Sequence, residues 1–161
     1  MLSHFAHHCP VFIFQSLERL SDDDSKYIKN ESKLFIQDWF SHKDKIDSNI
    51  LICHHHFIIV VVLNLSSVSG CGKDRLTNHI KSIGSIIGKS FFNRNHIPVF
   101  SKLDDSVLHN DSIIDFITYK QMFKLKESYN NFDTTIVLDV ASINVGNIYL
   151  PYDKWLLKYI I

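Results

Sequence analysis

The segment Ser69-Gly70-Cys71-Gly72-Lys73-Asp74 contains the residue types of a phosphate-binding loop. It follows an apolar run that predicts a buried strand and precedes a pattern that predicts a helix. In such a loop the backbone N–H groups point at phosphate oxygens, and the lysine reaches the β- and γ-phosphates. Further along, the run Ile136-Val-Leu-Asp139 ends on an acid that could support Mg²⁺. Gly70, Gly72, Lys73, Asp74 and Asp139 therefore form a candidate site for ATP and Mg²⁺.

This loop resembles the phosphate loop of ABC-type ATPases, whose pattern is Gly-x-Ser-Gly-Cys-Gly-Lys-Ser/Thr, but it departs from that pattern at two positions. Ser67 replaces the first glycine, which needs an unhindered backbone. Asp74 replaces the metal-binding Ser/Thr, and its carboxylate would repel a triphosphate. The sequence also lacks a Leu-Ser-Gly-Gly-Gln signature. We therefore favour a tight turn in which Ser69 or Asp74 caps the next helix, and a degenerate phosphate loop at residues 67–74 is the alternative.

Cys71 is the best nucleophile candidate, because a helix expected to begin near Asp74 would favour the thiolate and Lys73 would add to that effect. A thiol-dependent enzyme that uses Cys71 is the second alternative. We favour a small residue buried beneath the turn, since no partner base can be identified. Cys9, Cys53 and Cys71 lack the Cys-x-x-Cys spacing, which predicts free thiols in a reducing cytosol.

Ten histidines, with clusters near the N-terminus and at His54-His55-His56, raise the question of a metal site. Zinc needs about four converging ligands. On a strand His54 and His56 would share one face while His55 points to the other, so two at most could converge there. A solvated strand end explains the cluster, and we expect neither a metal nor any other cofactor.

The apolar pattern along the chain predicts alternating strands and helices. Strands are expected at Val11–Gln15, at Ile50–Cys53 and Phe57–Leu65 (one long strand or two), at Ile97–Phe100 and at Thr134–Val140. Helices are expected from Ser21 to about His42, from the turn to Gly88, and around Ile114–Lys126. The run Phe57–Leu63 has no polar alternation, so it should be a central strand covered on both faces. These elements predict one layered α/β or α+β domain over residues 1–161, with a central sheet flanked by about three helices.

Composition excludes several classes of protein. Seventeen basic residues balance 17 acidic ones, which argues against nucleic-acid and membrane-surface partners. The longest apolar run has seven residues, far short of the ~20 that span a bilayer, and the N-terminal segment lacks the Lys or Arg of a signal peptide. These features predict a cytoplasmic protein. Twenty-one isoleucines against two alanines indicate coding in an AT-rich genome.

A second resemblance extends over nearly the whole chain. It rests on Phe12-Ile-Phe-Gln-Ser16, Phe35-Ile-Gln-Asp-Trp39, Ser41-His42, Phe57-Ile-Ile-Val60, Ser69-Gly-Cys71, Asp74 and Thr135-Ile-Val137. These segments resemble a family of small Bacteroidota proteins that commonly carry the label "ABC transporter ATPase". Its members read Ser-Gly-Cys-Ser-Ile-Asp at the turn, and their Trp-His-Ala-Arg-Phe segment is Trp155-Leu-Leu-Lys-Tyr159 here, without the histidine. The resemblance implies a family fold without an established activity. The leading hypothesis is a non-catalytic binding or housekeeping protein, with homodimerisation through the aromatic C-terminal segment as one expectation.

Overall fold

The computed structural model describes residues 4–6, 8–65, 67–93, 95–101, 114–118, 121, 132–136 and 149–151. In these residues the chain forms an α+β fold of two helices and antiparallel strands, which confirms the expected fold class. The helices are α1 (Asp22–Gln37) and α2 (Gly70–Ile87). The strands are β1 (Val11–Gln15), β2 (Phe40–Ser41), β3 (Asp44–Lys45), β4 (Ser48–Cys53), β5 (Phe57–Val62), β6 (His96–Ser101), β7 (Ile114–Thr118), β8 (Phe132–Ile136) and β9 (Tyr149–Pro151).

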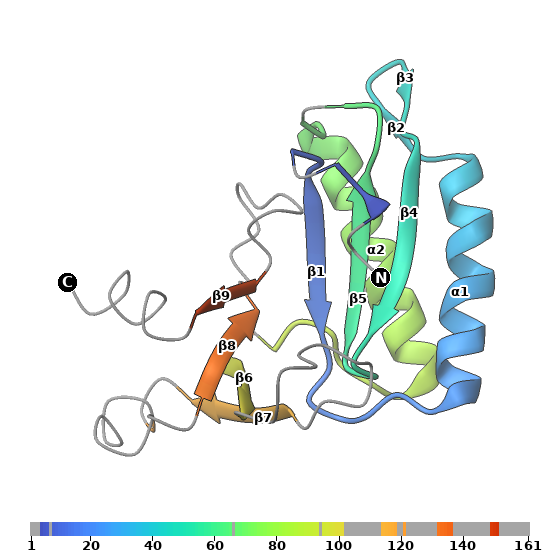
Figure 1. Ribbon diagram of the computed structural model, residues 1–161. Coiled ribbons are helices and arrows are strands. Elements are labelled where there is room, and N and C mark those ends of the chain that lie inside the picture. The colour runs from blue at the N-terminus through green and yellow to red at the C-terminus, as the bar shows by residue number, and fades with distance from the viewer. Residues whose placement is uncertain are drawn as a thin grey trace.

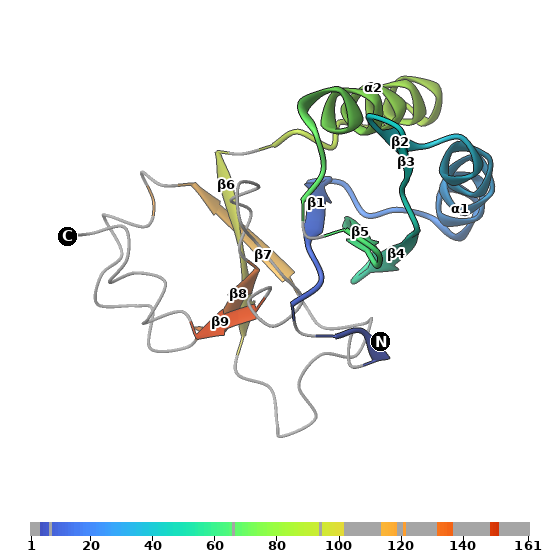
Figure 2. The ribbon, with the colours of Figure 1, turned by 90° about the horizontal axis from the view of Figure 1, so that it is seen from above.

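Three strands in the order β1-β5-β4 form the central sheet, and both pairings are antiparallel. Both helices cover one face of this sheet, while the second sheet, in the order β7-β6-β8-β9, lies on its other side (Figures 1 and 2). Every residue of β5 is buried, which confirms the predicted central strand. Leu63, one residue beyond β5, is 42% exposed.

The central sheet separates two sets of side chains because successive residues of a strand point to opposite faces. Ile58, Val60 and Val62 face the helices and pack with Leu76 and Ile80 of α2. Phe57 points to the opposite face, where its ring lies 6.4 Å from the ring of Phe116 in β7. β5 is thus buried from both sides, which explains its uninterrupted apolar sequence.

The first helix begins where the sequence predicts and ends earlier. Ser21 accepts a hydrogen bond from the Asp24 N–H, and the Asp24 carboxylate accepts one from the Ser21 N–H, a capping box. α1 ends at Gln37, so the prediction that it continues to His42 is wrong. Trp39 leaves the helical path to become fully buried in the core. Phe40 then begins β2, which makes a short hairpin with β3.

The predicted helix around Ile114–Lys126 is wrong at its start, because residues 114–118 form β7 and pair with β6. The β-branched and aromatic residues of β7 suit a strand, and the pairing along β6 outweighs the local helical spacing. β6 confirms the strand predicted at Ile97–Phe100. β8 begins at Phe132, two residues before the predicted strand, and residues 137–140 lie outside the described residues. In the described parts of the chain, no helix is long and apolar enough to cross a membrane.

Candidate ligand-binding site

The phosphate-loop residues form the first turns of α2. The helix begins at Gly70, four residues before the predicted start near Asp74, so Gly70, Cys71, Gly72, Lys73 and Asp74 are all helical. Ser69 is the N-cap, and its hydroxyl accepts a hydrogen bond from the Gly72 N–H at 3.2 Å. The prediction that Ser69 or Asp74 caps this helix is therefore confirmed, and the cap is Ser69.

The backbone of this segment is occupied by contacts within the protein. The Ser69 N–H donates to the Ser41 hydroxyl at 2.8 Å, and the Lys73 N–H donates to the Ser69 carbonyl at 2.9 Å. The Gly72 carbonyl accepts a hydrogen bond from Trp39 Nε1 at 2.9 Å. Three of the N–H groups that a phosphate loop would aim at its ligand thus already have acceptors.

Gly72 is explained by close packing rather than by phosphate binding. An added Cβ at this position would lie 2.7 Å from Val68 Cγ1 and 3.3 Å from the Phe40 carbonyl oxygen. Nothing lies within 4 Å of a Cβ at Gly70. Of these two positions, only position 72 therefore needs a glycine, because the start of α2 packs closely against β2 there.

The strand that leads into the segment also differs from that of a nucleotide-binding fold. β5 is antiparallel to both of its neighbours, whereas dinucleotide-binding folds are built on mostly parallel sheets. Asp139, the predicted metal-supporting acid, lies outside the described residues. The geometry of residues 67–74 gives no support to a site for ATP and Mg²⁺.

The three cysteines form no disulfide and lie in two kinds of setting. Cys71 is exposed on the first turn of α2, so the prediction that it is buried beneath the turn is wrong. The reason is that the helix starts before Cys71 and turns Gly72 toward the core instead. Cys9 and Cys53 are buried, and burial raises the pKa of Cys53 to about 11.

The histidine cluster occupies the turn between β4 and β5, not a strand. His54 and His55 have positive φ angles of 52° and 55°, and the His56 N–H donates to the Cys53 carbonyl. His54 is only 3% exposed, which overturns the interpretation of the cluster as a solvated strand end. No group of three or more His, Cys, Asp or Glu suited to a metal ion occurs in the part of the chain that the structure describes.

A cavity of about 200 Å³ lies between β1, the first half of α2 and the segment that follows α2. We call it the β1–α2 cavity. Its walls are mainly apolar: Phe12, Ile13, Phe14, Leu76, Phe91 and Phe92. Four polar residues complete the lining: Gln15, Lys73, Thr77 and Asn93. Lys73 of the phosphate-loop motif thus contributes to a cavity beside β1.

The cavity opens along an edge of the central sheet. The Gln15 N–H donates to the Phe91 carbonyl, away from β5, whereas the Ser16 N–H donates to the His56 carbonyl. Because backbone groups alternate in direction along a strand, the N–H and C=O of Ile13 point outward like those of Gln15. Among the described residues no backbone group bonds to Ile13 on this side. A ligand in the cavity could therefore meet a backbone donor and acceptor.

Gln15 is the most unusual polar group in the cavity wall. Its side chain is 2% exposed, and Nε2 donates to the Asn93 and His96 carbonyls, each at 3.0 Å. These two bonds fix the orientation of the amide. Its Oε1 is buried and has no hydrogen-bond partner within the described part of the chain. The segment that follows α2 thus holds the Gln15 amide in place in the wall of the cavity.

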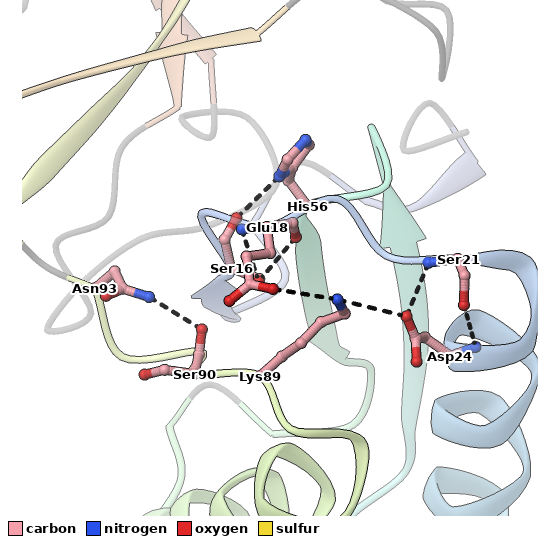
Figure 3. A network of polar contacts seen from close by, with 8 residues as sticks. All are labelled: Ser16, Glu18, Ser21, Asp24, His56, Lys89, Ser90 and Asn93. Atoms are coloured by element: carbon pink, nitrogen blue, oxygen red, sulfur yellow. Dashed lines mark hydrogen bonds and ion pairs between the residues drawn. The ribbon is translucent and has the colours of Figure 1, made fainter.

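The wall after α2 is held in place by a network at the end of that helix (Figure 3). Lys89 Nζ lies 3.6 Å from the Glu18 carboxylate and 3.9 Å from that of Asp24, which ties the end of α2 to the start of α1. Gly88 has a φ of 70° and ends α2 as predicted. Gly84 allows the chain to return closely, since a Cβ there would collide with the Lys89 carbonyl and the Phe91 ring.

The electrostatics of this network are set by burial and hydrogen bonding. Burial lowers the pKa of His56, although the bond between Nδ1 and the Ser16 carbonyl, 2.9 Å long, opposes the shift. Burial raises the pKa of the Asp24 carboxyl, but the hydrogen bonds with Ser21 and the nearby Lys89 more than offset this, and the pKa is lowered overall. The ion pairs and hydrogen bonds of this network join the end of α2 to the start of α1, which is a structural role.

Sequence reasoning identified one residue of the cavity, Lys73, and missed the rest. The sequence predicts Gln15 in a buried strand and Thr77 in a helix, and it indicates no function for either residue. Nothing in the local sequence indicates that Phe91–Asn93 returns to the edge of β1, because that contact depends on tertiary packing at Gly84.

Comparison with protein-family models, with curated proteins and with solved structures found no match.

Proposed function

We propose that this chain is a non-catalytic binding protein that takes a small amphipathic carboxylate in the β1–α2 cavity. The observation that carries the proposal is the combination of an apolar cavity lining with Lys73 from α2 and Gln15 from β1. Free thiols favour a reducing compartment, so we place the protein in the cytoplasm as part of the same proposal.

The dimensions of the cavity favour a small ligand. Pockets for drug-sized molecules begin at about 300 Å³, above the 200 Å³ found here. The six apolar side chains favour an aromatic or branched body, since they supply most of the contact surface. A nucleotide is too large and too polar for this lining.

The two polar groups define what the ends of the ligand should carry. Lys73 lies in the first turns of α2, whereas Gln15 ends β1, and the two elements run in the same direction (Figure 1). The polar groups therefore belong to opposite ends of the cavity. Lys73 suits a carboxylate, and the polar surface at Gln15 and Asn93 suits a hydroxyl group.

Three related compounds test this arrangement by chemical-shift titration of the ¹⁵N-labelled protein. We expect 3-(4-hydroxyphenyl)propanoate to bind most tightly, 3-phenylpropanoate less tightly and 3-phenylpropan-1-ol most weakly. For ligands of this size a Kd of about 0.1–1 mM is expected, or about 4–5.5 kcal/mol. Equal affinities, or shifts outside the cavity, would contradict the proposal.

Matched lysine variants test the charged end. Lys73→Met should weaken binding of 3-phenylpropanoate about twofold to fivefold, because an exposed ion pair contributes up to about 1 kcal/mol. The same substitution should leave the affinity for the neutral alcohol unchanged. Lys29→Met on α1 is the control, because Lys29 is also exposed but lines a different groove. An equal loss in both variants would refute a specific role for Lys73.

A further inference from the structure

The second edge of the central sheet, on β4, carries a different kind of surface. β4 pairs only with β5, and among the described residues no strand lies on its other side. A groove of about 440 Å³ runs between β4 and α1. We call it the β4–α1 groove; α1 stands beside β4 in Figure 1. Its lining residues come from both elements, so an occupant would touch the strand and the helix together.

The direction of the β4 backbone follows from two hydrogen bonds. The Val62 N–H donates to the Pro10 carbonyl, so the backbone N–H and C=O groups of Val62 point toward β1. The backbone groups of Ser48, its partner in β4, therefore point away from the sheet. The Leu63 N–H donates to the Asp47 carbonyl, which points inward. By alternation, the N–H and C=O groups of Ser48, Ile50 and Ile52 all face outward. These three residues form an edge that can accept another strand.

The helix side of the groove is positively charged. Lys26, Lys29 and Lys33 are exposed and lie on one face of α1, at spacings of three and four residues. None of them forms an ion pair within the described parts of the chain. Asp22 is the one acidic residue in the groove lining, so three ammonium groups stand against one carboxylate. The charge selects an acidic occupant.

Further groups in the groove favour an extended chain. Ser25 and Ser32 line the groove with their hydroxyl oxygens buried, so these residues leave room beside the strand without a charged group. Ile36 and Ile50 are half-buried there, which leaves apolar surface for alternate side chains of an incoming strand. A bound segment would pair with the β4 backbone and contact this apolar surface.

We propose that the β4–α1 groove binds an extended acidic segment of a partner protein, which adds to the central sheet as a strand next to β4. A second copy of the chain is a poorer occupant. Pairing two β4 edges would bring two rows of lysines together, and like charges at an edge oppose such pairing. This interaction is separate from ligand binding in the β1–α2 cavity.

A fluorescent peptide of sequence Glu-Val-Glu-Thr-Glu-Val tests the proposal through its anisotropy with the whole protein. We expect saturable binding that weakens when the ionic strength rises from about 0.05 M to about 0.3 M. A peptide with lysine in place of each glutamate should not bind. The combined variant Lys26→Gln, Lys29→Gln and Lys33→Gln should lose about tenfold in affinity, whereas Lys73→Gln keeps it.

Backbone methylation separates strand addition from simple charge attraction. N-methylation of alternate residues in one register removes the N–H groups that would face β4, and it should abolish binding. Methylation in the other register should leave binding intact. Equal effects of methylation in the two registers would overturn the proposal, and so would the absence of binding by the unmethylated glutamate peptide. A dimer that the combined lysine variant converts to monomer would also overturn it.

Discussion

Replacing Gly72 by alanine distinguishes the two roles that the Gly70-Cys71-Gly72-Lys73 segment could have. In a packed helix start, the new Cβ collides with Val68 Cγ1 at 2.7 Å and crowds the Phe40 carbonyl oxygen at 3.3 Å. Val68 is buried and β-branched, so it cannot swing aside cheaply, and the Phe40 oxygen belongs to the backbone. The start of α2 must therefore shift away from β2.

The size of the effect can be worked from these contacts. Overpacking in a core costs roughly 1–3 kcal/mol, and a shift of α2 also strains the buried bond from Trp39 Nε1 to the Gly72 carbonyl. Alanine is better than glycine in a helix by about 0.5–1 kcal/mol, which offsets part of this cost. We expect Gly72→Ala to lower the free energy of unfolding by about 1–2 kcal/mol.

Gly70→Ala is the matched control, because the two glycines lie two residues apart in the same turn. No atom lies within 4 Å of a Cβ at Gly70, so this variant should be as stable as the parent or more stable by up to about 1 kcal/mol. Urea denaturation followed by circular dichroism gives both midpoints, and equal m-values validate the comparison. A Gly72→Ala variant as stable as Gly70→Ala would refute the packing argument.

Three further predictions follow from the same structure. Calorimetric titration with Mg·ATP should show no micromolar binding, because the N–H groups of Ser69, Gly72 and Lys73 already have acceptors. Micromolar binding that Lys73→Ala abolishes would contradict this. Iodoacetamide should label Cys71 in the folded protein and should label Cys9 and Cys53 only after denaturation, as followed by mass spectrometry. Equal labelling rates of the three thiols in the folded state would count against the assigned burial. Burial lowers the pKa of His56 and His79, so the unfolded chain binds more protons below about pH 6.5. The free energy of unfolding should be fully retained above that pH and fall as the pH is lowered through it; a His79→Phe variant with an unchanged slope would contradict the assignment.

Patterns that depend on local sequence predicted most of the central sheet and both described helices. The apolar runs of β1 and β5 and the caps at Ser21, Ser69 and Gly88 act over a few residues, so the sequence displays them directly. The same reasoning failed where tertiary contacts decide. Trp39 has helical spacing with Phe35, yet it leaves the helix because its ring fills the core and its Nε1 bonds to the Gly72 carbonyl.

The candidate site was less predictable than the fold for a related reason. The phosphate-loop motif identifies Lys73 as a candidate binding residue. Its environment, however, depends on β1 and on residues 91–93, which are distant in sequence. Gln15 offered no signal, since a glutamine at the end of an apolar strand is common. Its role in the cavity wall depends on the bonds from Nε2 to the Asn93 and His96 carbonyls, which belong to a distant part of the sequence.

The location of a bound carboxylate is the most direct test of ligand binding in the β1–α2 cavity. Isotope-filtered NOE spectra of ¹³C-labelled protein with unlabelled 3-(4-hydroxyphenyl)propanoate report which side chains touch the ligand. We predict contacts from the ligand ring to the Leu76 and Thr77 methyl groups and to the ring of Phe92. Contacts confined to Ile36 and Ile50 in the β4–α1 groove, or no contacts at saturating ligand, would contradict the proposed function.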